Sequence, residues 1–232
     1  MSAAAEAAGG RELWVFGYGS LMWRPGFVYE EARHARLVGY RRSFCIYSVH
    51  HRGTPQRPGL VLGLDRGGAC EGIALRVAAA RADATRSYLQ AREQIYGVYR
   101  GVHANIALHE EPRRDVTALA FVAERAHANY ARLLPPAQAE LIRGARGVSG
   151  TNLDYFANTL RHLAALGIRE RALERLMVLV GPHACRRAGG DRVSASAAGM
   201  IAALRLRPAP GGRPRVNGHQ PFGYRLRLAE NG

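Results

Sequence analysis

Short runs of apolar and β-branched residues, separated by turn signals, dominate the first half of the chain, and this pattern is typical of a β-sheet. The segment Asp65-Arg66-Gly67-Gly68 lies between two such runs and predicts the turn of an antiparallel hairpin. Most of the sheet is therefore expected before residue 125. The predicted strands are 13–16, 36–47, 60–64, 71–77, 104–108 and 116–122.

Helical spacing of apolar residues replaces this pattern in two places. Asp83 can cap a helix that runs to about Tyr96, because Tyr88, Leu89 and Ile95 recur at helical spacing. After residue 134 the chain is predicted to be mainly helical. Three helices are expected there. The first begins at Pro135, the second follows Ser149 as its N-cap and ends at Gly167, and the third spans 170–180.

Length and composition favour one globular unit. The 232 residues are 47% hydrophobic, enough for one sizeable core. We predict a flexible N-terminus at 1–12, a folded domain at 13–180 and an Arg-, Gly- and Pro-rich tail at 181–232 that is poorly ordered or forms a short helix. The start lacks the basic and apolar regions of a secretory signal, and no apolar run reaches the ~18 residues of a membrane span.

The charge and cysteine content narrow the function classes further. Three widely spaced cysteines without a C-x-x-C pair give neither a disulfide framework nor a zinc site, so we expect a reducing, cytoplasmic location. The net charge is +15 and every basic residue is Arg. Residues 181–232 hold nine Arg against two acidic residues, a net charge of +7. A basic nucleic-acid-binding protein therefore stays an alternative, although nucleic acid is the less favoured partner because aromatic residues are sparse there.

The glycine-rich segment after the first strand, Gly17-Tyr18-Gly19-Ser20-Leu21, carries the first candidate chemistry. It lacks the third glycine of a dinucleotide fingerprint, and Ser20 lacks the flanking glycines of a nucleophile elbow. Its glycines can instead let backbone N–H groups converge on an anion or a developing oxyanion. Glu93, near the end of the 83–96 helix, is either a solvated acid paired with Arg92 or Arg100, or a catalytic acid.

Three blocks, in order along the chain, together resemble the ChaC-type γ-glutamylcyclotransferases, in their bacterial form. Further matches follow at His127 to Tyr130, in the helix at Pro135 and at Ser149 to Tyr155, so the resemblance covers about residues 13–180. The three blocks are Val15-Phe16-Gly17-Tyr18-Gly19-Ser20-Leu21 with Trp23 behind it, His51-Arg52-Gly53-Thr54-Pro55 followed by Pro58-Gly59, and Tyr88-Leu89 running to Arg92-Glu93.

The resemblance implies an α+β fold: a small mixed or antiparallel β-barrel wrapped by helices, with a helical C-terminal half. It implies Glu93 as the catalytic acid/base and Tyr99 and Tyr155 as residues near the pocket. Two departures concern the pocket wall: the segment 94–99 is longer than in animal members, and Arg100-Gly101 replaces a proline common in the family. The substrate-binding residues it implies are Val15, Phe16, Gly17, Tyr18, Gly19, Ser20, Leu21, Tyr99 and Tyr155.

The expected reaction is the cyclisation of the γ-glutamyl group of glutathione to 5-oxoproline, with release of Cys-Gly. It consumes no water and involves no redox change, so we expect neither a cofactor nor a metal. Other γ-glutamyl amines or dipeptides remain alternative substrates. Candidates for the substrate carboxylates are Arg24, Arg41, Arg52 and Arg57.

Overall fold

A closed five-stranded barrel forms the centre of the molecule. The computed structural model describes residues 11–93 and 97–184. The strands follow one another round the barrel in the order β1-β3-β2-β4-β5, with β1 and β5 parallel where the barrel closes and the long β2–β3 and β4–β5 pairs antiparallel. This architecture confirms the predicted α+β barrel. The strands are β1 (Leu13–Gly17), β2 (Glu31–Ser48), β3 (Gly59–Val77), β4 (Tyr99–Leu108) and β5 (Arg114–Ala123).

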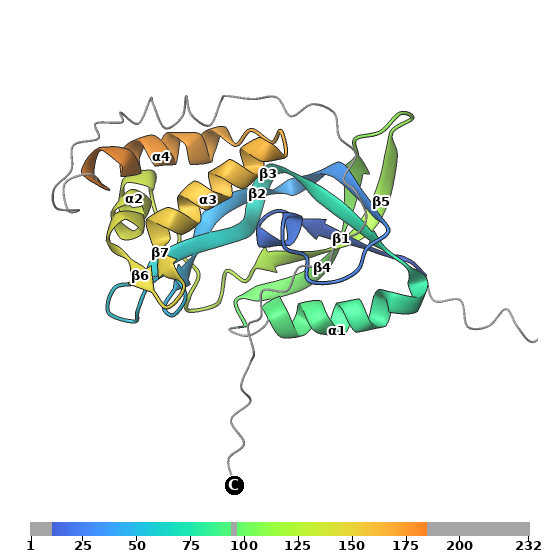
Figure 1. Ribbon diagram of the computed structural model, residues 1–232, viewed down its shortest axis with the longest axis horizontal. Helices are drawn as coiled ribbons and strands as arrows, with labels where there is room; N and C mark the ends of the chain where they lie inside the picture. Colours follow the sequence, from blue (N-terminus) through green and yellow to red (C-terminus); the bar gives the residue numbers. More distant parts are fainter. Residues whose placement is uncertain (1–10, 94–96, 185–232) are drawn as a thin grey trace, which may run out of the picture.

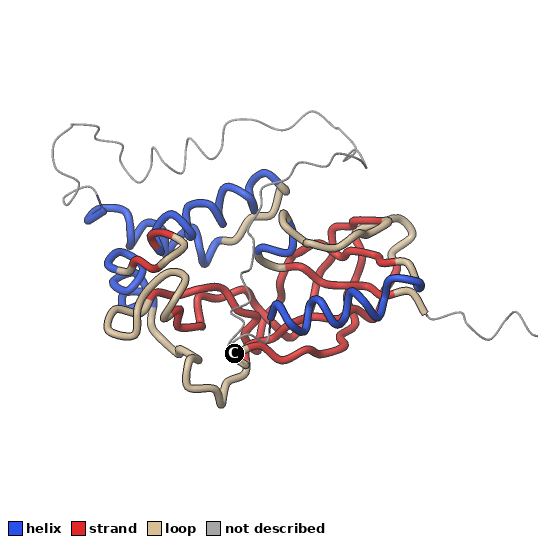
Figure 2. The backbone as a smooth tube through the Cα atoms, turned by 60° about the horizontal axis from the view of Figure 1, so that its bottom comes forward, coloured by secondary structure: helices blue, strands red, loops and turns tan. Residues whose placement is uncertain are grey.

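The helices cover the barrel from two sides. Figure 1 shows α2, α3 and α4 gathered together at one end, while α1 runs alone along the opposite side of the barrel. The turned view keeps the same grouping (Figure 2). The helices are α1 (Ala82–Glu93), α2 (Pro135–Gly144), α3 (Asn152–Ala165) and α4 (Arg171–Ala184), with short 3₁₀ turns η1 (Ser20–Met22) and η2 (Ala79–Arg81) and a two-residue ribbon of β6 (Arg146–Gly147) and β7 (Gly150–Thr151).

The core explains why the first strand is apolar at every position. All five residues of β1 are buried, because the strand is covered on both faces. On β2, Phe44 is buried and meets Phe156 of α3 edge to face, with 4.7 Å between the ring centroids. This aromatic contact joins α3 to the barrel.

The predicted hairpin within residues 60–77 is wrong. β3 is one continuous strand from Gly59 to Val77, and it pairs with β2 along nearly its whole length. Gly67 and Gly68 have positive φ values of 95° and 77°, but they form a bulge opposite Gly39 rather than a turn. The glycines bend the strand so that it can wrap the barrel.

The helix boundaries also differ in detail from the prediction. Thr151, not Ser149, caps α3, because its side chain accepts a hydrogen bond from the Asp154 N–H group at 3.0 Å. Helix α4 continues to Ala184, past the expected end at 180. The predicted helix segment 94–96 and most of the predicted N-terminus and tail lie outside the described residues.

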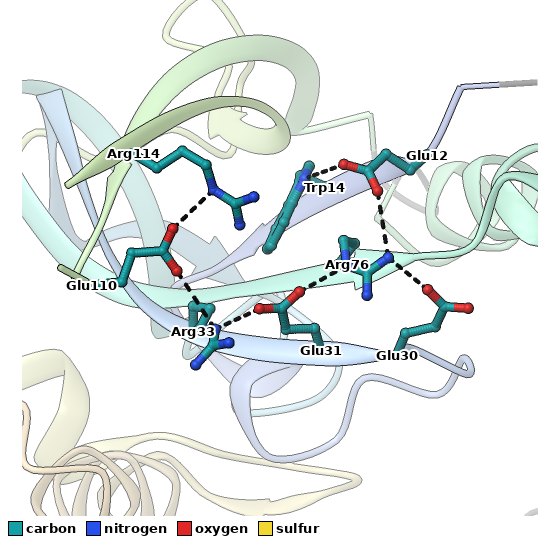
Figure 3. Close-up of polar contacts among 8 residues, drawn as sticks. All are labelled: Glu12, Trp14, Glu30, Glu31, Arg33, Arg76, Glu110 and Arg114. Carbon is teal, nitrogen blue, oxygen red and sulfur yellow. Dashed lines mark hydrogen bonds and ion pairs between the residues drawn. The ribbon is translucent and has the colours of Figure 1, made fainter. Parts of the chain in front are cut away.

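An ionic network covers one part of the barrel surface, away from the site described below. Arg76 of β3 binds Glu30 at 2.7 Å and Glu31 at 2.8 Å, and Arg114 of β5 binds Glu110 at 2.9 Å (Figure 3). Such partly exposed pairs contribute little singly. They do show that arginines of the described domain are engaged with carboxylates of the same fold. No helix in the described part of the chain is both long and apolar enough to cross a membrane.

Candidate active site

A small pocket of about 70 Å³ brings the glycine-rich loop and the acid of α1 together. Gly19, Ser20 and Leu21 line it from one side, and Glu93, the last residue of α1, lines it from another. The loop follows β1 and the acid ends the helix that lies along the barrel, so 72 sequence positions separate residues that share one cavity. The other lining residues are Tyr18, Leu62, Tyr99, Phe121 and Tyr155.

Glu93 is a sheltered carboxyl. Its side chain is 16% exposed, and burial raises its pKa above the ordinary value for Glu, while the positive charge of Arg92 acts in the opposite direction. Arg92 Nε lies 3.4 Å from Glu93 Oε1, whereas Arg100 pairs with Glu124 instead. Glu93 is therefore paired with Arg92, not with Arg100, and its carboxyl is largely shielded from solvent.

Arg92 also joins the helix to the glycine-rich loop. Its guanidinium donates to Ser20 Oγ at 3.0 Å and to the carbonyl oxygens of Arg24 and Pro25, each at 2.9 Å. The same side chain thus holds the loop and contacts the acid. A continuous chain of contacts from Ser20 through Arg92 to Glu93 fixes how the two halves of the pocket face each other.

The loop itself leaves backbone donors available. The 3₁₀ turn η1 uses the Met22 N–H group, which donates to the Gly19 carbonyl at 2.9 Å. Within residues 11–93 and 97–184, no hydrogen-bond acceptor faces the N–H groups of Gly19, Ser20 or Leu21. Unpaired N–H groups at the start of a helical turn suit an anion or an oxyanion.

A free edge of β3 explains the tyrosines of the pocket. At Leu62 the strand pairs with β2 on one side only, and side chains satisfy its other edge. Tyr99 Oη donates to the Leu62 carbonyl at 2.7 Å, and Tyr155 Oη accepts the Leu62 N–H at 3.3 Å. Two residues earlier, Asn152 at the start of α3 takes both main-chain groups of Leu60, at 2.6 and 2.7 Å.

Burial keeps the pocket tyrosines neutral. It raises the pKa of Tyr18, Tyr99 and Tyr155, and the nearby Glu93 charge acts in the same direction on each. Their hydroxyls are protonated at neutral pH and serve as hydrogen-bonding groups, not as bases. The Tyr18 hydroxyl donates to no other side chain or carbonyl in the described parts of the chain, so it is available to a bound molecule.

The predicted site residues divide into two groups. Tyr18, Gly19, Ser20, Leu21, Glu93, Tyr99 and Tyr155 all line the pocket. Val15, Phe16 and Gly17 do not: they are buried strand residues of β1 that support the loop from beneath. Their roles in binding stay predictions.

None of the four arginines proposed for the substrate carboxylates lines either of the two cavities described at Glu93 among residues 11–93 and 97–184. Arg41 binds Asp65 and the Arg66 carbonyl, and Arg52 binds the Ser149 carbonyl and lies over the Tyr155 ring. Arg57 borders a separate hollow near α2, and Arg24 lines neither cavity at Glu93. Arg92 lines the adjoining pocket of about 180 Å³, which shares Glu93 and Tyr99 with the smaller one and also contains His50, His51 and Asn129.

Sequence reasoning missed one buried arginine that contacts the loop. Arg42 of β2 lies two positions before the buried Phe44 on the same strand, so it points to the same face, into the core. That signal was present in the sequence, because a charged residue at an apolar position of an alternating strand is unusual. The prediction named its exposed neighbour Arg41 instead.

The geometry defines the class of site: a sheltered carboxyl and unpaired backbone N–H groups line one small pocket of a mixed barrel. Comparison with known proteins identifies the family. A family model described as "ChaC-like protein" matches residues 13–183. The glutathione-specific γ-glutamylcyclotransferase of Escherichia coli is 34% identical over 173 residues, 72% of this chain and 72% of that protein. The mouse glutathione-specific γ-glutamylcyclotransferase 1 is 34% identical over 177 residues, 73% and 78% of the two chains.

These matches show that the chain belongs to the ChaC-like family. The crystal structure of a yeast γ-glutamylcyclotransferase specific to glutathione shares the fold, with a TM-score of 0.65 and 22% identity over 73% of this chain and 95% of that one. The family resemblance predicted from the sequence is confirmed.

Proposed function

We propose that the protein is a glutathione-specific γ-glutamylcyclotransferase that converts glutathione to 5-oxoproline and Cys-Gly. The names of the related enzymes support the substrate, and the pocket supports the chemistry. One observation carries the proposal: a sheltered carboxyl, Glu93, lines the same cavity as the N–H groups of Gly19 to Leu21.

The reaction needs one nucleophile, one proton relay and one anion site. The α-amine of the γ-glutamyl unit attacks its own side-chain carbonyl carbon and forms the C–N bond of a five-membered lactam. The C–N bond to the next residue then breaks, and its nitrogen leaves as an amine. One proton moves from the attacking to the leaving nitrogen, so the atoms balance without water, metal or redox cofactor.

In this proposal Glu93 moves that proton. An amino group has an ordinary pKa near 8 and a Glu near 4.3, so transfer to an exposed Glu meets a mismatch of about 4 pKa units, or ~5 kcal/mol. Burial raises the pKa of Glu93 and narrows this gap. In the proposed cycle Glu93 accepts the proton of the attacking amine and delivers it to the leaving nitrogen.

In this proposal the glycine-rich loop stabilises the tetrahedral intermediate. Its N–H groups at Gly19, Ser20 and Leu21 have no acceptor within the described chain and border the same cavity as Glu93. A positioned donor of this kind contributes about 3–4 kcal/mol when negative charge develops on the carbonyl oxygen. The narrow pocket also folds the glutamyl chain back on itself, and this positioning lowers the barrier further.

The larger adjoining pocket is suited to the part of glutathione that leaves. It shares Glu93 with the smaller pocket, so a substrate whose scissile bond lies at Glu93 extends from one pocket into the other. Arg92 lines this second pocket, and its positive charge favours a carboxylate bound there, although its guanidinium already bonds Ser20 and two loop carbonyls. The proposal includes a cytoplasmic location, a reducing compartment suited to the buried thiols of Cys45 and Cys70.

The test is turnover of purified full-length protein, with 5-oxoproline and Cys-Gly measured by mass spectrometry. Glutathione and γ-glutamyl-alanine are compared at equal concentrations. We expect both products from glutathione and much slower release of 5-oxoproline from γ-glutamyl-alanine. Preference for the alanine compound would replace glutathione by a broader substrate class, and no 5-oxoproline from either compound would refute the cyclotransferase proposal.

A further inference from the structure

The core of the barrel contains an arginine that the reaction described above does not use. Arg42 of β2 has a side chain with 0% exposure, and it points to the same side of the strand as Phe44. Removing a guanidinium from water is costly unless its donors are paired. A methionine or leucine at this position would fill the space without that cost, so the contacts of Arg42 call for an explanation.

Every nitrogen of the guanidinium is bonded, and each bond goes to a different part of the fold. Nε donates to the Tyr18 carbonyl at 2.6 Å, and the two terminal nitrogens donate to the Glu71 carbonyl at 2.6 Å and to Glu170 Oε2 at 2.7 Å. These groups belong to the glycine-rich loop, to β3 and to the residue directly before α4. Because the guanidinium is planar and rigid, the three bonds together fix the direction of the first one.

The bond to Tyr18 sets the orientation of the next backbone donor. The peptide between Tyr18 and Gly19 is trans, since the single cis bond within the described residues is Glu111–Pro112. In a planar trans peptide the C=O and N–H groups point in opposite directions. Holding the Tyr18 carbonyl against Arg42 therefore turns the Gly19 N–H away from Arg42, and Gly19 lines the pocket of Glu93.

We infer that Arg42 is a positioning residue for the cyclisation: it orients the Gly19 N–H toward the developing oxyanion by holding the Tyr18 carbonyl, and Glu170 holds Arg42 in turn. The inference rests on the proposed function. If Arg42 has this role, the rate of cyclisation depends on the ion pair between Arg42 and Glu170, although neither residue lines the pocket of Glu93. Arg42 touches no substrate, so its effect appears in the transition state through Gly19.

The test compares Arg42→Gln, Arg42→Lys and Glu170→Ala with a matched control, Arg36→Gln. Arg36 lies on the same strand but is 55% exposed, and its ion pair with Glu71 is 3.6 Å long. A misdirected oxyanion donor lowers kcat, so we expect a fall of about 10- to 100-fold for Arg42→Gln with KM for glutathione changed less than roughly threefold. Arg42→Lys and Glu170→Ala fall less, and Arg36→Gln stays at the wild-type rate.

Two further readouts separate positioning from loss of structure. The acid limb of the pH–rate profile keeps its position in Arg42→Gln, because Arg42 is not among the charges that act on Glu93. In ¹⁵N-labelled protein without substrate, the Gly19 and Ser20 amide resonances shift and exchange faster in Arg42→Gln and Glu170→Ala, while those of Arg36→Gln do not. Glu170→Ala keeps the test usable if the Arg42 variants do not fold, because the Glu170 side chain is 21% exposed.

Unchanged kcat in a folded Arg42→Gln or Glu170→Ala protein, or unchanged Gly19 resonances in either variant, would overturn the inference. A rise in KM at constant kcat would do the same, because it would place Arg42 in substrate binding. If wild-type protein forms no 5-oxoproline from any γ-glutamyl compound, the proposed function fails instead, and the amide resonances still decide whether Arg42 directs the loop.

Discussion

Replacing Asn152 by leucine tests how α3 is attached to the barrel. Asn152 is fully buried and satisfies both the N–H and the C=O of Leu60, at the edge of β3 that no strand covers. Leucine has a similar volume but no polar atom, so both main-chain groups lose their partner. Each buried unsatisfied group costs about 1–3 kcal/mol, and the two together cost about 2–6 kcal/mol. This is a large part of the ~5–15 kcal/mol that stabilises a typical domain.

The measurement is urea unfolding of the full chain, followed by circular dichroism, together with the melting temperature. A loss of about 3 kcal/mol lowers Tm by roughly 6–12 °C in a domain of this size. Asn105→Leu is the matched control, because Asn105 is exposed and bonds only the Thr117 hydroxyl, at 3.0 Å. A loss below about 1 kcal/mol for Asn152→Leu, or an equal loss for the control, would refute the reasoning.

Three further predictions concern Arg92, Glu93 and Gly26, which lies in the segment after the glycine-rich loop. Arg92→Met removes the charge that opposes the effect of burial on Glu93, so the pKa of Glu93 rises and the acid limb of the kcat/KM profile moves to higher pH; a limb that stays in place contradicts this. Glu93→Gln removes the titrating group at this position. Because the folded-state pKa of Glu93 is raised, ionisation of Glu93 destabilises the folded wild-type protein as pH rises through that pKa. Urea unfolding should show that the variant is more stable than wild type at pH 7 and that this difference is gone at pH 3. Gly26→Ala strains a φ of +78° at about 1–2 kcal/mol and places a Cβ 2.0 Å from Tyr88 Oη, so it should destabilise more than Gly167→Ala, where φ is +69° and space is open; equal losses in urea would contradict the clash.

Much of the fold was predictable because local signals and tertiary packing agree. The apolar run of β1, the strand β5 and the helix at Pro135 appear within two residues of where the pattern placed them, whereas β4 begins at Tyr99, five residues before its predicted start. The turn signal at Gly67-Gly68 failed for a physical reason. Glycines with positive φ serve a bulge as well as a turn, and only the pairing of β3 with β2 across the whole barrel decides between them.

The residues that carry the chemistry of the candidate site were predictable, but the contacts that hold them in position were not. Glu93 and the loop at 17–21 were identified through the family resemblance, and the structure places Glu93 beside residues 18–21. The contacts of Arg92 with Ser20 and of Arg42 with Tyr18 join positions 72 and 24 residues apart, and no local pattern encodes such distances. Four arginines were candidates for the substrate carboxylates on charge alone, and the sequence does not show that the fold already engages two of them, Arg41 and Arg52.

The isosteric variant Glu93→Gln is the sharpest test of whether Glu93 relays the proton during lactam formation. Purified wild-type and variant proteins are given glutathione, and the initial rate of 5-oxoproline release is measured alongside glutathione binding by calorimetry. We predict that Glu93→Gln still folds and still binds glutathione, while 5-oxoproline release falls by at least about 10²-fold, the lower range for loss of a general acid/base. A folded variant that binds glutathione and retains most of the wild-type rate would contradict it.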